Sequence, residues 1–290
     1  MTEKKKWSKK KKIVVIILSI FLFLLVATVG AGIGVLNWYC SVADYEIVSS
    51  AEFAKPDTKI IAHRGFRGIA PENTLPAFEE AGKNGFWGAE CDIYRSKDGV
   101  WVVQHDVNTY RMMDFTKSIE KCTYEELLEH NTDNGVNIEN YPDLKICSFG
   151  EYLQACEKYG MAAVIELKGK NNTEHYDEIM AEIAKYSVDV VFISFHEENL
   201  KKLRELSDAP MFYLTSKLND EAIEIAKNIG NCGIDFNAGK EKNFENDAEM
   251  IKKIQAEGLA IGAWTVDDPE LMKQCVDLGI DYITTDCITY

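Results

Sequence analysis

Short apolar segments alternate with longer amphipathic segments from Lys59 to the end of the chain, and this alternation limits the fold more than any other feature. The apolar segments are four to seven residues long and rich in β-branched side chains, as expected for buried strands joined by helices. The expected strands are residues 60–63, 88–93, 162–167, 190–195, 211–214, 232–236, 260–264 and 281–284. Eight such strands predict an α/β fold of the TIM (β/α)8 barrel type. A doubly wound open sheet is the structural alternative, although it seldom needs eight such even repeats.

Helical periodicity and capping residues occupy most of the intervals between these strands. The expected helices are residues 74–84, 175–186, 197–206, 219–229, 246–257 and 269–278. One interval, between His105 and Met161, is much longer than the others. It follows a hairpin arm that ends at His105, and it contains helix starts capped by Thr123 and Ser148. We interpret residues of about 107–150 as a small insertion after strand 2, at the mouth of the barrel.

The N-terminus differs in composition from the rest of the chain. Residues 1–12 carry seven lysines and one glutamate, and residues 13–36 contain no charged side chain. About 20 apolar residues are enough to cross the hydrocarbon core of a bilayer. We therefore predict a cytoplasmic basic tail, a single-pass transmembrane helix at 13–37, a stalk at 38–57 and an extracellular domain at 58–290. A cleaved signal peptide is the alternative, but its apolar region usually has about 7–15 residues.

Charge and cysteine content exclude two other classes of protein. The net charge of the chain is −15, and −21 remains when the basic tail is set apart. A body this acidic is poorly suited to a phosphate backbone, so we expect no nucleic-acid partner. The eight cysteines include no C-x-x-C pair, which argues against a zinc site. Disulfides stay open, with Cys122 and either Cys147 or Cys156 as the candidate pair, and so does the oligomeric state.

Polar and charged side chains stand at the ends of the predicted strands, where α/β folds hold their active sites. They are His63 and Arg64 on the first strand, Glu90 and Asp92 on the second, His105 on the hairpin arm, Glu166 and Lys168 on the third strand and Trp264 on the seventh. Side chains two positions apart on a strand point to the same face. Both members of each carboxylate-bearing pair are therefore expected to point toward the barrel axis.

This set of side chains suits a metal-assisted reaction of a phosphate ester. Glu90, Asp92 and Glu166 would repel one another at the barrel axis unless a cation lay between them, and oxygen ligands favour Mg²⁺, Ca²⁺ or Mn²⁺ over zinc. Arg64 and Lys168 supply the positive charge that a phosphodiester needs in its transition state. The two histidines can act as a general base and a general acid.

Eight short motifs with this spacing resemble those of the glycerophosphodiester phosphodiesterase family. They are His-Arg-Gly (63–65), Pro-Glu-Asn-Thr (71–74), Glu-x-Asp (90–92), Lys-Asp-Gly (97–99), His-Asp (105–106), Glu-Leu-Lys (166–168), Trp-Thr-Val (264–266) and Thr-Thr-Asp (284–286). The resemblance covers residues of about 58–290, and with the predicted span it implies a membrane-anchored bacterial-type member. It also implies a TIM barrel with a small insertion after strand 2. The departures are peripheral, such as Cys287, where the family often has proline.

The resemblance further implies a role for each candidate site residue. These roles are acid/base catalysis for His63 and His105, phosphate binding for Arg64 and Lys168, ligation of one divalent cation for Glu90, Asp92 and Glu166, and an aromatic wall against the glycerol or alcohol for Trp264. The cation in the family is commonly Ca²⁺ or Mg²⁺, and Mn²⁺ is a further option. Among the neighbouring residues, we expect Asp106 to orient a histidine. We expect Glu72 and Asn73 to order their loop by capping the next helix, and His130 to be a solvated residue.

The expected function is the hydrolysis of a glycerophosphodiester to an alcohol and sn-glycerol 3-phosphate. In the family mechanism, the 2-hydroxyl of the glycerol is a candidate internal nucleophile. A membrane anchor would make lysophospholipids or glycerophosphate polymers candidate substrates beside soluble headgroups. Two alternatives stay open, namely a lysophospholipase D-like activity on lysophospholipids and a catalytically silent barrel that binds glycerophosphodiesters or a wall polymer. The sequence names neither the headgroup nor the metal.

Overall fold

The structure, a computed structural model, describes residues 28, 39–52, 54–55, 57–169, 172–239 and 244–290. The chain divides into residues 1–42 and residues 43–290, and the architecture below belongs to the second unit. Among the described residues, no helix combines the length and the apolar character needed to cross a membrane. The transmembrane helix predicted at 13–37 lies, apart from Thr28, outside the described residues.

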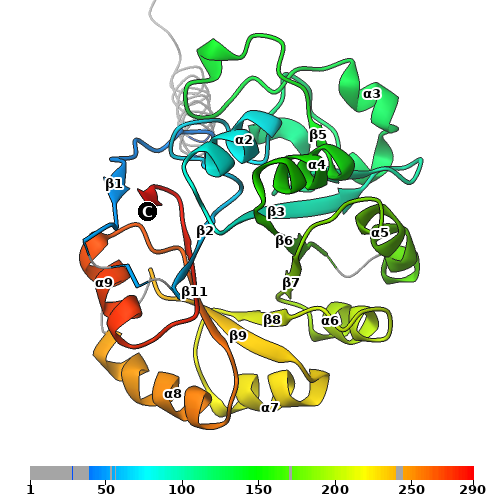
Figure 1. The fold of residues 1–290 in the computed structure, drawn as a ribbon. Helices are drawn as coiled ribbons and strands as arrows, with labels where there is room; N and C mark the ends of the chain where they lie inside the picture. Colours follow the sequence, from blue (N-terminus) through cyan, green and yellow to red (C-terminus); the bar gives the residue numbers. More distant parts are fainter. Residues whose placement is uncertain (1–27, 29–38, 53, 56, 170–171, 240–243) are drawn as a thin grey trace, which may run out of the picture. The chain divides into compact units, whose positions relative to one another are not determined.

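Eight parallel strands form a closed barrel, and Figure 1 shows them around a common axis with helices outside. The strands are β2 (Lys59–Ala62), β3 (Gly88–Arg95), β6 (Ala162–Leu167), β7 (Val190–Ser194), β8 (Met211–Thr215), β9 (Cys232–Asn237), β10 (Ile261–Trp264) and β11 (Tyr282–Thr285). They pair in the order β2-β11-β10-β9-β8-β7-β6-β3, and pairing of β2 with β3 closes the ring. The predicted barrel is therefore confirmed, and the open sheet is wrong.

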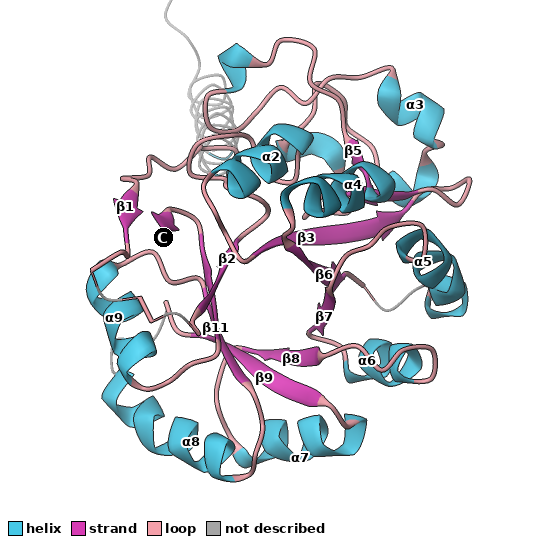
Figure 2. Cartoon of the chain, viewed as in Figure 1, coloured by secondary structure: helices cyan, strands magenta, loops and turns pink. Residues whose placement is uncertain are grey.

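A helix follows each barrel strand except the last, and Figure 2 shows these helices on the outside of the ring. They are α2 (Leu75–Lys83), α4 (Phe149–Tyr159), α5 (Tyr176–Ile183), which η4 (Thr173–His175) precedes, α6 (Glu197–Arg204), α7 (Asp220–Ile229), α8 (Phe244–Ala256) and α9 (Pro269–Asp277). Helix α7 begins after its predicted cap, because the side chain of Asn219 accepts a hydrogen bond from the amide of Ala222.

The alternation of side chains along each strand divides the apolar residues into two cores. Residues that point outward, such as Ile60 and Phe192, pack against the helices in the larger cluster. Residues that point inward, such as Ile61, Val164 and Phe212, fill the barrel near the amino ends of its strands. Closer to the carboxyl ends, the inward positions change from apolar to charged on some strands, as from Val164 to Glu166 on β6, and stay apolar on others, as at Ile193 and Leu214.

The insertion forms a small layer with its own core beside β3. It contains β4 (Trp101–Val103), β5 (Cys147–Ser148), α3 (Tyr124–Leu128) and the short 3-10 helices η1 (Thr109–Arg111), η2 (Ile119–Lys121) and η3 (Ile138–Asn140). Strand β4 runs antiparallel to β3 and carries the hairpin arm predicted from the sequence. Thr123 and Ser148 both form complete capping boxes. Because α4, which Ser148 caps, is the helix of the second βα unit, the extra residues end before it.

The two ends of the described domain pair with each other. Strand β1 (Val48–Ser49) pairs in parallel with β12 (Ile288–Thr289), which follows the last barrel strand. Tyr45, just before β1, donates a hydrogen bond to the carboxylate of Asp286 over 3.0 Å. The segment predicted as a stalk therefore contacts the domain from Tyr45 onward.

All eight cysteines lie among the described residues, and the structure joins none of them in a disulfide. The candidate disulfide of Cys122 with Cys147 or Cys156 is therefore absent. Each of these three side chains is buried, and burial raises the pKa of the Cys147 thiol well above its usual value. Such cysteines act as small apolar core residues.

Phe78→Ala tests the outer core. The ring of Phe78 is fully buried and meets Tyr152 edge-on, with the ring centroids 4.8 Å apart. Its removal leaves a cavity, so we expect the free energy of unfolding to fall by about 3–5 kcal/mol in urea denaturation. The control is Leu206→Ala, at a position 42% exposed, for which we expect a change below about 0.5 kcal/mol. Equal effects of the two changes would contradict this packing.

Candidate active site

A cavity of about 460 Å³ opens at the carboxyl ends of the barrel strands. Its lining includes seven of the eight residues singled out in the sequence: His63, Arg64, Glu90, His105, Glu166, Lys168 and Trp264. The eighth, Asp92, is 1% exposed and contacts both Arg64 and Lys168 behind this lining. The fold therefore brings together all eight candidates, which come from five separate segments of the chain.

Three carboxylates converge from two adjacent strands. Glu90 and Asp92 lie on β3, and Glu166 lies beside Asp92 on β6 in the strand register. All three are buried, and one ligand oxygen from each lies within 4.8 Å of the others. Burial, followed by repulsion from Asp92, raises the pKa of Glu166 to about 7, and the same two causes raise that of Glu90. Burial also opposes the charge of Asp92, but Lys168 and Arg64 outweigh it and hold the pKa low.

These carboxylates fit one hard divalent cation. All of the possible ligand atoms are carboxylate oxygens. The three carboxylates lie close together at buried positions, where positively charged side chains only partly balance their charge. Cations such as Ca²⁺ and Mg²⁺ prefer such ligands. Lys168 lies 2.9 Å from a Glu166 oxygen and 3.2 Å from Asp92, so the triad already borders a positive charge suited to a phosphate.

The turn after β2 places Arg64 against the triad. Arg64 has a positive φ of 55° and Gly65 one of 72°, and a Cβ on Gly65 would meet Ala77 at 2.7 Å. Only glycine fits so close to α2 in this conformation. The turn directs the amide of Arg64 to Glu90 Oε2 over 2.8 Å, and the guanidinium lies 3.5 Å from Asp92. The His-Arg-Gly motif thus holds Arg64 against two carboxylates of the triad, with its amide on Glu90 and its guanidinium beside Asp92.

Each histidine of the cavity contacts a carboxylate through Nδ1. His63 Nδ1 is 2.7 Å from Asp286, and His105 Nδ1 is 2.9 Å from Asp106. Asp106 orients a histidine, as the sequence predicted. A proton on Nδ1 leaves Nε2 of each ring available as a base. Burial lowers the pKa of His63 even though Asp286 opposes the shift, which favours a neutral ring.

Glu72 and Asn73 have other contacts than predicted. The helix cap is Thr74, whose hydroxyl accepts a hydrogen bond from the amide of Ala77. Asn73 instead has a left-handed backbone, and its amide group donates to Asp92 over 2.8 Å. Glu72 is buried among three guanidinium groups, from Arg64, Arg67 and Arg111, at 2.9, 3.0 and 2.6 Å. These cations hold its pKa low despite burial, so Glu72 is an ionised centre of the site.

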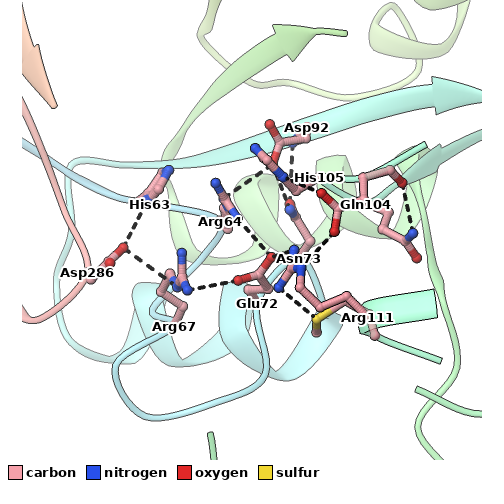
Figure 3. A network of polar contacts seen from close by, with 12 residues as sticks. His63, Arg64, Arg67, Glu72, Asn73, Asp92, Gln104, His105, Arg111 and Asp286 are labelled. Carbon is pink, nitrogen blue, oxygen red and sulfur yellow. Dashed lines mark hydrogen bonds and ion pairs between the residues drawn. The ribbon is translucent and has the colours of Figure 1, made fainter. Parts of the chain in front are cut away.

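The contacts of Glu72 join the two histidines in one polar network, which Figure 3 shows. The network runs through His63, Asp286, Arg67, Glu72, Arg111, Asp106 and His105. Arg64 connects it to the metal-ligand candidates through Asp92. Sequence reasoning missed Glu72, Arg67 and Arg111 as parts of the site. The Pro-Glu-Asn-Thr motif was an available signal for Glu72 but not for the two arginines.

The opposite wall of the cavity is mostly apolar. Trp264 and Phe195 meet edge to face with their ring centroids 5.6 Å apart, and Ile193 and Leu214 adjoin them in the lining. Asp235 lies in this wall, and sequence reasoning missed it because it stands inside an apolar strand. The cavity therefore combines a charged side with an apolar side.

Comparison with known proteins is consistent with this geometry. The model of the glycerophosphoryl diester phosphodiesterase family matches residues 63–289. A glycerophosphodiester phosphodiesterase of Bacillus altitudinis is 29% identical over 236 residues, which cover 79% of this chain and 94% of that protein. Glycerophosphodiester phosphodiesterase 1 of Bos taurus is 31% identical over 263 residues, 79% of each chain. The structure of an Oleispira antarctica phosphodiesterase in complex with the product sn-glycerol-3-phosphate has a TM-score of 0.72 and 26% identity, and the match covers 82% of this chain and 95% of that one.

Cation binding can be tested without an assay of activity. We expect Ca²⁺, Mg²⁺ or Mn²⁺ to raise the melting temperature of the metal-stripped protein, because the cation offsets repulsion among the triad in the folded state alone. The gain is about 2.7 kcal/mol at a free cation concentration of about 100 times Kd. Glu90→Gln should remove this shift, whereas Glu224→Gln, on the exposed face of α7, should keep it. An equal shift in Glu90→Gln, or none in the unaltered protein, would contradict the assignment.

Proposed function

The chain belongs to the glycerophosphoryl diester phosphodiesterase family, and we propose that it hydrolyses glycerophosphodiesters to an alcohol and sn-glycerol 3-phosphate. One observation carries the proposal: a single cavity joins a buried carboxylate triad, two cations and two carboxylate-bound histidines. Hydrolysis of a phosphodiester can use each of these groups. A site that only binds the ester has no need for two oriented histidines. This argues against the silent barrel.

The charged side of the cavity suits the phosphate. Arg64 and Lys168 border the triad and would bind the non-bridging oxygens of a phosphate placed beside it. A divalent cation held by Glu90, Asp92 and Glu166 would polarise a phosphoryl oxygen and acidify a nearby hydroxyl or water. Ca²⁺, Mg²⁺ and Mn²⁺ all remain candidates, because each accepts oxygen ligands.

We assign the two proton transfers to the histidines. His63, whose pKa burial lowers, would take the proton of the attacking hydroxyl or water through Nε2. The attacking group is either water or the 2-hydroxyl of the substrate glycerol, which gains effective molarity from being held in place. His105, held by Asp106, would give a proton to the oxygen of the departing alcohol. Asp286 and Asp106, which contact Nδ1 of the two rings, would keep each Nε2 turned toward the substrate.

We also propose that the enzyme is a single-pass membrane protein with its barrel outside the cell. The support is the charge-free run at 13–36 after a lysine-rich tail. The segment from Tyr45 contacts the domain, so few residues of the chain separate the end of the predicted span, at residue 37, from the barrel.

An anchored enzyme meets lysophospholipids as well as soluble headgroups. Choline release from lysophosphatidylcholine, compared with release from glycerophosphocholine, separates these substrates.

The histidine assignment predicts the effect of two substitutions. His63→Ala and His105→Ala should each lower kcat about 10²- to 10⁴-fold on a glycerophosphodiester, because each removes a proton-transfer group. The matched control is His130→Ala. His130 stacks on Phe115 in the insertion, with the ring centroids 4.0 Å apart, and it is not in the lining of the cavity. We expect its kcat to stay within about twofold of that of the unaltered enzyme. Activity that survived both His63→Ala and removal of divalent cations would overturn the site.

A further inference from the structure

The carboxylate that contacts His63 is itself held from a distant part of the chain. Asp286 Oδ1 lies 2.7 Å from His63 Nδ1, and Asp286 Oδ2 accepts a hydrogen bond from the hydroxyl of Tyr45 over 3.0 Å. Among the described residues, Tyr45 is the one hydrogen-bond donor to Oδ2. Asp286 is only 6% exposed, so water can compensate little for the loss of that donor.

The second oxygen matters because it sets the plane of the carboxylate. The terminal torsion of an aspartate side chain is broad, so a carboxylate held by one oxygen can turn. The backbone of Asp286 is fixed, since its amide donates to Asp267 Oδ1 over 2.7 Å. With Oδ2 held by Tyr45, Oδ1 is directed at His63 Nδ1, and that contact determines where Nε2 of the ring points.

Backbone pairing holds the segment that carries Tyr45 against the end of the barrel. The amide of Val48 on β1 donates to the carbonyl of Cys287, the residue after Asp286, over 3.1 Å. The amide of Ser50 donates to the carbonyl of Thr289 over 2.8 Å. Figure 1 shows β1 beside the C-terminus, where these two ends of the domain meet. The hydroxyl of Tyr45 is therefore presented from a paired strand and not from a loose tail.

The turn after β2 packs against the same segment. A Cβ on Gly68 would lie 2.6 Å from the carbonyl oxygen of Asp286 and 2.9 Å from Cδ1 of Ile47, so only glycine fits between them. The guanidinium of Arg67 lies over the ring of Tyr45, 5.8 Å from its centroid. Tyr45 thus has fixed neighbours on its ring as well as on its hydroxyl.

The charge states of the pair suit a lasting hydrogen bond. Burial, followed by the charge of Asp286, raises the pKa of Tyr45 above its usual value, so the phenol keeps its proton at neutral pH. Burial opposes the charge of Asp286, but His63 and Arg67 outweigh it and hold the pKa of the carboxyl low. A neutral donor therefore faces an ionised acceptor, which makes the bond stronger than one between neutral groups.

We propose that Tyr45 is a positioning residue of the active site, which holds Asp286 and, through it, the ring of His63 in the orientation for proton transfer. The inference rests on the proposed function, because it names what positions the histidine assigned there as the base. Tyr45 does not line the cavity, so it acts through Asp286 and not by contact with the substrate. Part of the segment predicted as a stalk then belongs to the catalytic machinery.

Tyr45→Phe in the full-length enzyme tests this role, because it keeps the ring beside Arg67 and removes only the hydroxyl. We expect kcat on glycerophosphocholine to fall about 10-fold, an effect of the size expected for one hydrogen bond to a charged group. KM should stay within about twofold, because the substituted group does not touch the substrate. Steady-state kinetics with a saturating divalent cation measure both constants.

A double-substitution cycle tests whether Tyr45 acts through Asp286. Asp286→Ala removes the acceptor, so adding Tyr45→Phe to it should lower kcat by less than about twofold further. Independent effects would instead multiply. A further loss of about 10-fold in the Asp286→Ala enzyme would therefore show that Tyr45 acts by another route, and the inference would be wrong.

Tyr290→Phe is the matched control for a purely structural effect. The hydroxyl of Tyr290 donates to the carbonyl of Thr58, so the change removes a hydrogen bond from the same meeting point of the two chain ends, but Tyr290 does not line the cavity. We expect it to lower the melting temperature while kcat stays within about twofold of the unaltered value. An equal loss of kcat in Tyr290→Phe would overturn the inference.

Two outcomes separate this inference from the proposed function. If the unaltered enzyme cleaves the ester and Tyr45→Phe leaves kcat unchanged, the positioning role is wrong and the proposed function stands. If the unaltered enzyme cleaves no glycerophosphodiester with Ca²⁺, Mg²⁺ or Mn²⁺, both are wrong.

Discussion

Repulsion among three buried carboxylates is the constraint on which the rest of this site depends. Glu90, Asp92 and Glu166 present oxygens within 4.8 Å of one another where little water can screen them. The protein balances part of this charge with Arg64 and Lys168. A divalent cation would balance the rest. The same surplus of negative charge that makes the three carboxylates costly to bury would give them affinity for a cation.

The positively charged side chains also connect the residues of the site in one network of ion pairs. Arg64 contacts Asp92 on one side and Glu72 on the other, and Glu72 extends the network through Arg67 and Arg111 toward the two histidines. Each histidine is therefore positioned by a carboxylate that is itself held by an arginine. The segment next to the predicted membrane span takes part as well, since Tyr45 donates a hydrogen bond to the carboxylate that holds His63. Displacement of any one of these groups would disturb the others.

Much of the barrel and the reactive side chains could be predicted because they depend on local pattern. Strand period and position at strand ends are visible in the sequence, and they located Glu166 and Lys168 on the same face as the β3 carboxylates. The contacts of Glu72 and the partnership of Tyr45 with Asp286 could not be predicted in this way. Tyr45 and Asp286 are 241 positions apart and meet only because the barrel closes. Asp235 was missed for another reason, since its strand reads as apolar core.

The central claim is that the cavity cleaves the bond between phosphorus and the oxygen of the departing alcohol. Hydrolysis of glycerophosphoethanolamine by the full-length enzyme in ¹⁸O-labelled water tests it, with both products analysed by mass spectrometry. We expect ¹⁸O in the phosphate of sn-glycerol 3-phosphate and none in the ethanolamine, because the attacking oxygen ends on phosphorus whether water attacks directly or opens a cyclic phosphate. Label in the ethanolamine would show attack at carbon, and it would contradict the arrangement of cation, arginine and histidines described above.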